Sequence, residues 1–274
     1  MIAQYENRAS AFTGTYHGND GRTLQCAAHL HHHLELALLL HGQTVGYAGT
    51  ERCQLTDGDA FLSFPNQIHR FDSVGPEVFY LFIVDPDMMP ELEPAFEGSV
   101  LHSARIPGAA ADPEILRLAA LLVEGTNSGD QYEKVAKRGY LLALFARLLG
   151  MAKPTGAAPG DSQALKTVLS YCVKNYRSDL SLSVLEEQLH ISRTYISHLF
   201  SDKLHIRFND YINSLRVSYA CHYLEGDDYS VTEIADLVGF GTTRTFDRAF
   251  QKRMGCTPSD YRRESSRPRA DEKR

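Results

Sequence analysis

The sequence predicts an α+β protein of several domains, in which a small β-barrel with trailing helices precedes an all-α domain. Three observations support this. Short apolar runs alternate with turn residues between positions 24 and 84, apolar spacing becomes helical beyond Asp112, and one helix-turn-helix pattern occurs twice after Ser162. We expect a barrel over 1–111, a helical segment over 112–150, a linker over 151–161 and a helical domain over 162–274.

Composition places the chain among globular proteins. Of its 274 residues 43% are hydrophobic, which argues against wholesale disorder, and no apolar stretch reaches membrane-spanning length. The first residues lack a basic region followed by an apolar core, so no secretion signal is expected. Five cysteines at scattered spacings indicate free thiols in a reduced, cytoplasmic protein.

Charge is distributed unevenly along the chain. The net charge is −6, but from Ser162 onward there are 17 basic and 15 acidic residues, against 11 and 19 in the part before it. The acidic residues before Ser162 would repel a polyanion such as nucleic acid. If the chain binds a polyanion, the contacts must therefore come from clustered cations after Ser162.

The first domain is predicted to contain short strands with frequent turns. Residues 36–40 form an apolar run, residues 60–64 form another that stops at Pro65, and residues 78–84 end at Asp85 and Pro86. The sequence Asp-Gly-Asp at 57–59 has turn composition. Several short strands in this arrangement favour a barrel or a sandwich.

Histidines gather in the first of these strands. From His29 the chain follows the spacing H-x-H-x(3)-E-x(6)-G, which includes His31 and Glu35, and a later Pro-Asn-Gln-Ile-His stretch ends in His69. Side chains alternate along a strand, so we expect His29, His31, His33 and Glu35 on one face. A shared pocket for these groups is geometrically allowed.

This pair of motifs resembles that of the cupins, which are small β-barrels. In metal-binding cupins the residues corresponding to His29, His31, Glu35 and His69 hold one divalent ion, and the set suits zinc, nickel, manganese or iron(II). Gln67 stands where cupins usually have glycine, so we assign the four residues to a small polar ligand, without metal or cofactor. A hydrogen-bonded polar core, a metal site, and a partly exposed strand without a specific role are the alternatives.

Helical spacing follows the barrel. Ile115, Leu118 and Leu122 recur on one face, a second series runs from Val135 to Leu148, and a Gly- and Ser-containing stretch at 125–129 separates them. Residues 153–160 are rich in Gly, Pro and Ala and cannot build a core, so they are predicted to be a linker.

The tail contains one pattern twice. Corresponding apolar positions are 49 residues apart before the turn (Leu182, Leu185, Leu189 with Val231, Ile234, Val238) and 50 after it (Ile196, Phe200, Tyr211 with Phe246, Phe250, Tyr261). The second copy therefore has one more residue in its turn, while the helices on both sides keep their phase. Two such units can enter two successive major grooves of DNA.

The second copy has clear helix boundaries. Ser230 and Glu233 form a capping-box pattern, Gly239 lies in the turn, and Gly255 suits a left-handed helix end before a final helix from Pro258. Cationic and polar side chains occupy the outer face of the helix between these glycines: Thr243, Arg244, Asp247, Arg248 and then Lys252. Such arginines can read guanine in the major groove.

This second copy, with its Gly-Phe, Arg-Ala-Phe-Gln-Lys, Gly-Cys-Thr-Pro and Tyr-Arg segments between 239 and 262, resembles the AraC/XylS family of transcription regulators. The first copy and its connecting helix resemble the same family through Ser192, Tyr195, Ile196, Phe208 and Tyr211. The resemblance covers about 180–263. It implies two helix-turn-helix units joined by a long helix near 208–224, and a sensor that is commonly sugar-responsive.

The first copy departs from the family pattern at two positions. Glu186 aligns with Ala235, where a small residue is usual, and His205 aligns with Gly255. A buried unpaired carboxylate is unfavourable, so Glu186 should reach outward or find a cation. The corresponding outer face is also less cationic: Arg193, Thr194, Ser197 and His198.

We therefore expect a transcription regulator, either an activator or a repressor, that binds double-stranded DNA, is controlled by a small effector such as a sugar, and has no catalytic residues. A homodimer formed through 112–150, contact with RNA polymerase if it activates, and no association with membranes are also expected. A cupin metalloenzyme of oxygenase or isomerase type with a DNA-binding tail is the alternative. A helical domain that binds another protein is the third interpretation.

Overall fold

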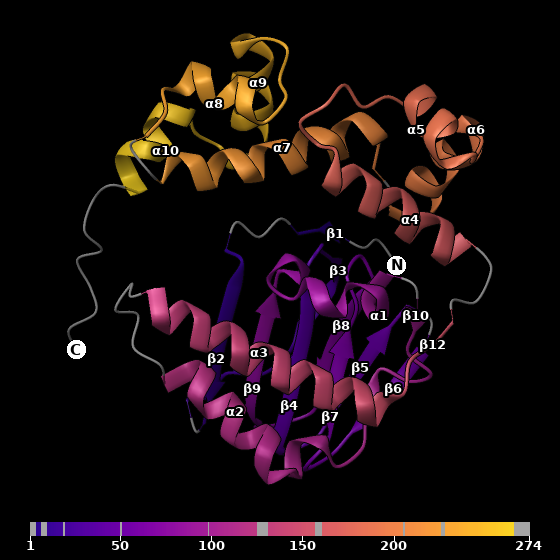
Figure 1. The fold of residues 1–274 in the computed structure, drawn as a ribbon, viewed down its shortest axis with the longest axis vertical. Helices are drawn as coiled ribbons and strands as arrows, with labels where there is room; N and C mark the ends of the chain where they lie inside the picture. The colour runs from indigo at the N-terminus through magenta and orange to yellow at the C-terminus, as the bar shows by residue number, and fades with distance from the viewer. Residues whose placement is uncertain are drawn as a thin grey trace. The chain divides into compact units, whose positions relative to one another are not determined.

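The computed structural model describes residues 4–6, 10–18, 20–49, 51–97, 99–124, 131–156, 161–204, 206–225 and 228–265. These residues form two compact units (Figure 1). The first unit ends at Thr167 and the second begins at Val168, so the boundary lies within helix α4 (Asp161–Lys174).

Two five-stranded sheets pack face to face in the first unit. One sheet has the order β1 (Gln4–Tyr5), β3 (Cys26–Leu30), β8 (His69–Ser73), β5 (Thr44–Ala48), β6 (Glu51–Leu55). The other has the order β11 (Arg105–Ile106), β7 (Ala60–Ser63), β4 (Leu34–His41), β9 (Val78–Val84), β2 (Phe12–His17). Pairing is antiparallel except between β1 and β3. This confirms the predicted β-domain.

Strand β4 is buried on both faces, which explains its almost continuous apolar sequence. Leu34, Leu36 and Leu38 belong to a core that includes residues of the trailing helices. Ala37 and Leu39 belong to a second core between the sheets. Since side chains alternate along a strand, Glu35 lies on the same face as Ala37 and Leu39 and points into the barrel.

The trailing helices α2 (Pro113–Glu124) and α3 (Gln131–Ala152) cover the sheet that contains β4 (Figure 1). Asp112 caps α2 by accepting the N–H groups of Glu114 and Ile115, and it pairs with Arg147 of α3 at 2.7 Å. Before them lie α1 (Glu93–Glu97) and three short 3-10 helices, Pro86–Met88, Pro90–Leu92 and Ala109–Ala111.

The segment expected to be a linker is partly ordered against the barrel. Helix α3 continues two residues past Gly150, and β12 (Thr155–Gly156) pairs with β10 (Ser99–Val100). The backbone groups of the Gly- and Pro-containing stretch thus find partners that its composition did not indicate. The described part of the predicted linker is therefore more structured than expected.

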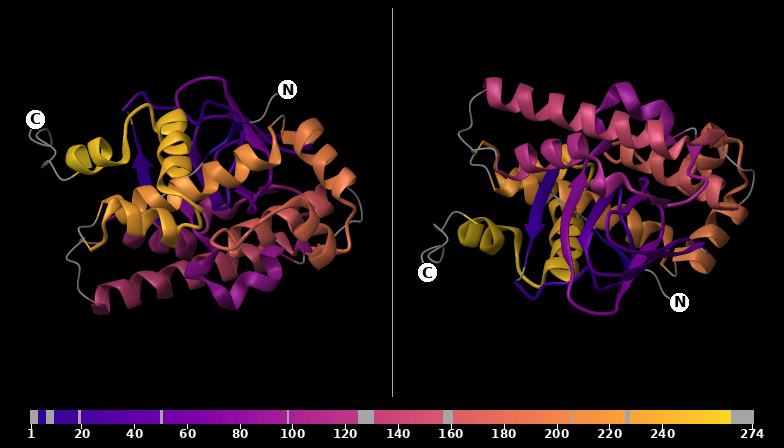
Figure 2. Two further views of the ribbon diagram at one scale, coloured as in Figure 1. Left: turned by 90° about the horizontal axis from the view of Figure 1, so that it is seen from above. Right: turned by 90° about the horizontal axis from the view of Figure 1, so that it is seen from below.

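The second unit is helical. After α4 come α5 (Leu182–Leu189), α6 (Arg193–His198), a π-helical turn (Leu199–Leu204), α7 (Phe208–Leu224), α8 (Val231–Leu237), α9 (Thr243–Met254) and α10 (Pro258–Ser265). Helix α7 has the predicted bounds and connects the pair α5 and α6 to the pair α8 and α9 (Figure 2). The all-helical prediction is confirmed.

Both copies use a hydroxyl side chain to cap the corresponding helices. Ser181 and Ser230 cap α5 and α8, and Ser192 and Thr242 cap α6 and α9. The capping box of Ser230 and Glu233 forms as predicted. The first pair of caps is 49 residues apart and the second 50, so the additional residue lies in the second turn.

The cores of the two copies also correspond. The rings of Phe200 and Tyr211 are 5.3 Å apart, and those of Phe250 and Tyr261 are 5.6 Å apart. The first copy differs in its turn, where His190 takes a left-handed conformation (φ 55°) at the position that corresponds to Gly239. It also has a six-residue α6 followed by a π-helical turn, whereas α9 has twelve residues. His205 lies outside the described residues.

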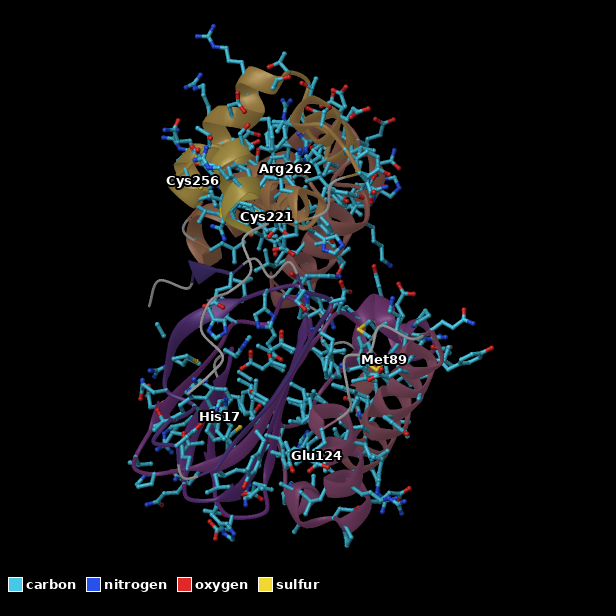
Figure 3. All side chains as sticks on the ribbon, turned by 90° about the vertical axis from the view of Figure 1, so that its left-hand side faces the viewer. His17, Met89, Glu124, Cys221, Cys256 and Arg262 are labelled. Atoms are coloured by element: carbon cyan, nitrogen blue, oxygen red, sulfur yellow. The ribbon has the colours of Figure 1, made fainter. Side chains whose placement is uncertain are left out.

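All five cysteines are free thiols, as their spacing predicted. Cys221 on α7 and Cys256 after α9 belong to the helical unit (Figure 3). Burial raises the pKa of Cys172 to about 12, which makes this thiol unreactive. Among the helices searched in the described parts of the chain, none is long and apolar enough to cross a membrane.

Candidate functional site: a buried histidine cluster and the recognition helices

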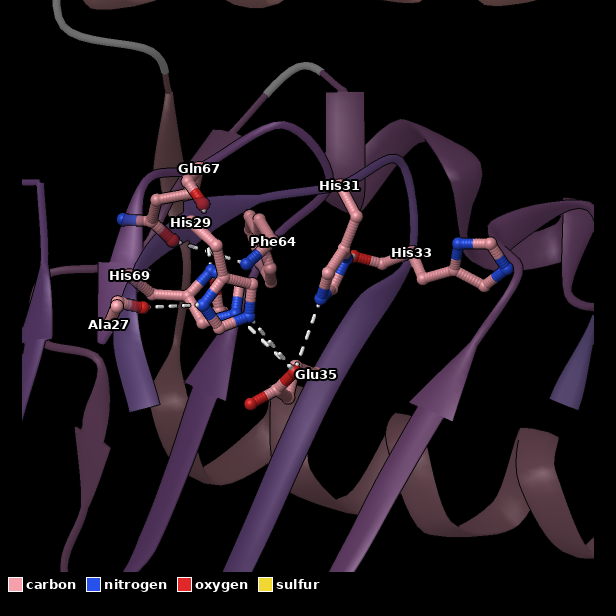
Figure 4. Close-up of polar contacts among 9 residues, drawn as sticks. Ala27, His29, His31, His33, Glu35, Phe64, Gln67 and His69 are labelled. Carbon is pink, nitrogen blue, oxygen red and sulfur yellow. Dashed lines mark hydrogen bonds and ion pairs between the residues drawn. The ribbon is translucent and has the colours of Figure 1, made fainter. Parts of the chain in front are cut away.

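Four residues predicted to share a site meet inside the barrel (Figure 4). His29 comes from β3, Glu35 from β4 and His69 from the start of β8, while His31 lies in the bend between β3 and β4. Glu35 Oε2 is 3.1 Å from His31 Nε2, 3.3 Å from His69 Nε2 and 3.9 Å from His29 Nε2. All four residues are between 1% and 4% exposed.

Backbone carbonyl groups fix the orientation of the three rings. The Nδ1 atoms of His29, His31 and His69 lie 2.9, 3.0 and 2.8 Å from the carbonyl oxygens of Ala27, His33 and Gln67. A carbonyl oxygen can only accept, so each Nδ1 carries the hydrogen. Each Nε2 is then turned toward Glu35, and in the neutral ring it presents a lone pair.

The cluster therefore brings three imidazoles and one carboxylate together in a region that excludes water. Burial lowers the pKa of His29, but the Cys26 thiol and the Glu35 carboxylate outweigh burial and raise the pKa to about 10. Burial raises the pKa of Glu35, but the electrostatic interaction with His69 and the hydrogen bonds with the imidazoles of His29, His31 and His69 bring the pKa well below its usual range. Positive charge, as a proton or a cation, is needed here to balance the carboxylate.

The expectation for His33 is wrong. The chain bends at His32 and His33, so strand alternation does not continue from His29 to Glu35. His33 Nε2 lies 3.0 Å from the Ser10 carbonyl oxygen, away from the cluster (Figure 4). Burial lowers the pKa of His33 to about 4, so its ring is neutral at physiological pH.

Supporting residues around the cluster escaped sequence reasoning. Ser63 Oγ lies 3.2 Å from His69 Nδ1, and the Gln67 side-chain oxygen accepts the Phe64 N–H at 3.1 Å. Asn66 has a left-handed backbone conformation (φ 61°), and its backbone N–H donates to the His31 carbonyl at 2.8 Å. The proximity of the Pro-Asn-Gln stretch to His69 was the one sequence signal for this turn.

The helical unit presents the predicted polar faces. On α9, Arg244, Asp247 and Arg248 are exposed and Thr243 is half-buried, while Phe246 and Phe250 are buried on the opposite face. On α6, Arg193, Thr194, Ser197 and His198 are exposed. The two helices therefore present the residue sets that the repeat predicted.

Two of these side chains have acidic neighbours. Lys252 Nζ lies 2.7 Å from Asp210 of α7, and His198 Nδ1 lies 3.7 Å from Asp202. Both pairs are exposed, and surface ion pairs contribute only about 0–1 kcal/mol. Lys252 can therefore exchange its carboxylate partner for another anion at little cost.

As expected, the Glu186 carboxylate is not left buried without a partner. Its carboxylate reaches outward and accepts the N–H of Arg193 at 3.0 Å, at the start of α6. A negative charge is favourable at a helix N-terminus, so this contact supports α6. Arg216 of α7 donates to the carbonyls of Tyr176 and Ser178, each at 2.8 Å.

Comparison with known proteins agrees with this architecture. Residues 14–170 match the family described as AraC-like ligand binding domain, and residues 185–264 match a helix-turn-helix domain family. The uncharacterized HTH-type transcriptional regulator YijO of Escherichia coli (strain K12) is 38% identical over 125 residues, which are 45% of this chain and 43% of YijO.

A second relative extends over more of the chain. The uncharacterized HTH-type transcriptional regulator YfiF of Bacillus subtilis (strain 168) is 23% identical over 272 residues, covering 95% of this chain and 86% of YfiF. The match therefore spans less than half of YijO but most of YfiF.

A solved structure shares the fold. ToxT from Vibrio cholerae O395, bound to (E)-4-(8-methylnaphthalen-1-yl)but-3-enoic acid, superimposes with a TM-score of 0.50 at 12% identity, covering 94% of this chain and 100% of ToxT. The likeness extends to a β-domain followed by helix-turn-helix units. This chain belongs to the AraC family of helix-turn-helix transcription regulators, with an AraC-like ligand binding domain before its DNA-binding helices.

Proposed function

We propose that this protein regulates transcription by binding a specific double-stranded DNA sequence through α6 and α9, under the control of a small ligand bound at His29, His31, Glu35 and His69. The observation that carries the proposal is the duplicated pair of capped helices whose exposed faces are polar and cationic. The buried cluster in the separate β-domain supports ligand control, because its charges require a partner.

The two recognition helices are proposed to contribute unequally. Helix α9 is a full twelve-residue helix with two exposed arginines, whereas α6 has six residues and begins beside the Glu186 carboxylate. An arginine that contacts guanine bidentately contributes about 1–3 kcal/mol of discrimination. We infer that α9 supplies most of the sequence preference and that α6 contributes mainly to positioning.

Replacing Arg244 or Arg248 by alanine is expected to weaken binding to the preferred DNA sequence by about 5- to 150-fold relative to random DNA. The preferred sequence is first selected from a random pool of duplexes, and affinities are then measured by fluorescence anisotropy at physiological salt. Arg22→Ala, which removes one exposed charge from the β-domain, is the control and should leave the preference unchanged. Unchanged preference in both helix variants would show that α9 does not read bases.

We propose that two protomers associate through α2 and α3. In the first turns of α3, Tyr132 and Val135 are 72% and 69% exposed, and Leu121 of α2 is 37% exposed. Paired protomers would place four recognition helices on a repeated site. If the protein activates transcription, contact with RNA polymerase is part of the proposal, as is action in the cytoplasm.

Val135→Glu is expected to convert the dimer into a monomer, because it places a charge in the proposed apolar contact. Sedimentation velocity at micromolar concentration measures the change. Lys134→Glu alters the neighbouring exposed residue without removing apolar surface and should leave the dimer intact. A wild-type protein that sediments as a monomer would refute this part of the proposal.

We propose no catalytic role for the cluster. A catalytic metal keeps an open position for its substrate, whereas the four side chains here are at most 4% exposed. Control of DNA binding requires only that the ligand differ in affinity between two states of the protein. The direct test is the affinity for the selected duplex with and without bound ligand.

A further inference from the structure

We propose that Asp210 competes with the DNA backbone for Lys252 and thereby limits the affinity of the helical unit for DNA of any sequence. The fold places this carboxylate on a cation of α9 where a phosphate group would otherwise bind. This role of Asp210 rests on the proposed function, because it presupposes that α9 enters a groove of DNA.

Lys252 lies on the face of α9 that carries the arginines. Arg244, Arg248 and Lys252 follow one another at intervals of four residues, which puts them on one side of the helix. A recognition helix contacts base edges mainly through its N-terminal residues. Lys252 belongs to the last turn of α9, so its ammonium group is placed for a phosphate rather than for a base.

Asp210 holds this ammonium group from a distant part of the chain. Its carboxylate lies 2.7 Å from Lys252 Nζ and belongs to the first turn of α7, 42 positions earlier. The side chains of Lys252 and Asp210 are 74% and 47% exposed, so solvent has access to the pair. A phosphate that binds Lys252 must displace Asp210, and the loss of that ion pair reduces the net gain of the new contact.

The corresponding carboxylate of the second copy makes a different contact. Asp210 and Asp260 are 50 positions apart, and each is the third residue of its helix, where a negative charge is favourable. Asp260 pairs with Arg263 of its own helix α10. The helix start therefore accounts for an acidic residue in both copies, and of the two it is Asp210 that also contacts a recognition helix.

The first copy opposes a phosphate at the same place in another way. The position of Lys252 corresponds to Asp202, which is exposed at the end of the first recognition helix. From Ser162 onward the chain has 17 basic and 15 acidic residues, so the helical unit is close to neutral. In both copies a carboxylate thus offsets the cationic charge at the end of the recognition helix.

The expected consequence is moderate affinity without loss of sequence preference. Phosphate contacts do not read sequence, so competition for Lys252 weakens the binding of all duplexes about equally and leaves base recognition to Arg244 and Arg248. A bound effector typically changes the affinity for a second ligand by about 5- to 150-fold. Moderate affinity for DNA keeps such a change within the range that decides whether a site is occupied.

The test compares a neutral variant of Asp210 with the wild-type full chain. Fluorescence anisotropy measures affinity for the duplex selected by the wild type and for a random duplex, between about 50 and 200 mM salt. Asp210→Asn should tighten binding to both duplexes by about 2- to 5-fold, with unchanged preference. Salt screens the Asp210–Lys252 pair as well as the phosphate contact, so in the variant the logarithmic salt slope should steepen by up to about 0.9.

Two controls separate competition for Lys252 from a general effect of charge. Asp228→Asn removes the same charge from an exposed carboxylate that has no ion pair with the described residues, and its salt slope should match the wild type. Lys252→Gln should weaken binding to both duplexes about equally, and adding Asp210→Asn to it should have no further effect. Circular dichroism verifies folding, and Asp210→Ser is a second neutral variant.

A folded Asp210→Asn variant that binds DNA no more tightly than the wild type would overturn the inference, and weaker binding would show that the ion pair braces α9 instead. A gain in affinity that persists in the Lys252→Gln background would overturn it too, because Asp210 would then not act through Lys252. A wild-type protein that binds DNA without preferring any sequence would refute the proposed function, while the random duplex would still test the competition.

Discussion

Gly239→Ala is expected to destabilise the helical unit by about 2–5 kcal/mol. Gly239 has φ 87°, a conformation that costs an L-residue about 1–2 kcal/mol. A Cβ atom there would lie 2.6 Å from the Arg177 carbonyl oxygen and 2.9 Å from its carbonyl carbon and Cα. These are backbone atoms that cannot rotate away, so relief requires the turn of the second helix-turn-helix to move, which adds about 1–3 kcal/mol.

Urea unfolding followed by circular dichroism at 222 nm measures this effect, since the second unit is helical. Gly255→Ala is the matched control: Gly255 has a similar φ of 76°, but a Cβ atom there meets nothing within 4 Å. Gly255→Ala should therefore lower the free energy of unfolding only by the cost of the left-handed backbone conformation, about 1–2 kcal/mol. Equal losses in the two variants would show that the close approach to Arg177 contributes nothing.

The second large effect is expected for Arg216→Met, which should destabilise the same unit by about 2–4 kcal/mol. The guanidinium donates to the carbonyls of Tyr176 and Ser178, which follow the end of α4, and lies 5.7 Å from the Phe240 ring in the second turn. Methionine keeps the apolar stem but leaves both carbonyls without this donor. Helices α4, α7 and the second turn would lose their common contact.

Arg177→Met provides the comparison, because the hydrogen bonds of the Arg177 side chain to the described residues go to the hydroxyl groups of Tyr176 and Tyr223. Those hydroxyls can turn to water, so we expect a loss below about 1 kcal/mol. Arg216→Lys should fall between wild type and Arg216→Met, since an ammonium lacks the planar pair of donors. A loss in Arg177→Met as large as in Arg216→Met would refute the proposed role of the two carbonyls.

Much of the helical unit was predictable because its signals are local. The capping box at Ser230, the glycine at 255 and the bounds of α7 depend on residues a few positions apart. Strand β9 was equally predictable from the sequence, because turn residues bound Val78–Val84. Arg216 was not predictable, since its partners are about 40 residues earlier in the chain and are backbone atoms.

The four residues of the buried cluster were predicted together, but the path of the chain between them was not. A continuous strand from His29 to Glu35 would have placed His33 with them, and the bend at His32 and His33 prevents this. The rings are oriented by backbone carbonyls, a group that every residue carries, and the position of those carbonyls depends on tertiary structure. The spacing therefore predicted the donors, and only the fold reveals why they point at one another.

The extra residue of the second copy lies in a turn, where it leaves the buried faces of the helices unchanged. Adding one residue inside an α-helix rotates everything beyond it by about 100° relative to what comes before, which would turn a buried phenylalanine toward solvent. Between Val238 and Thr242 the same insertion lengthens only a turn, so both flanking helices retain their faces. A turn therefore accepts a change in length that a helix does not, and shortening this one offers a way to engineer the spacing of the two recognition helices.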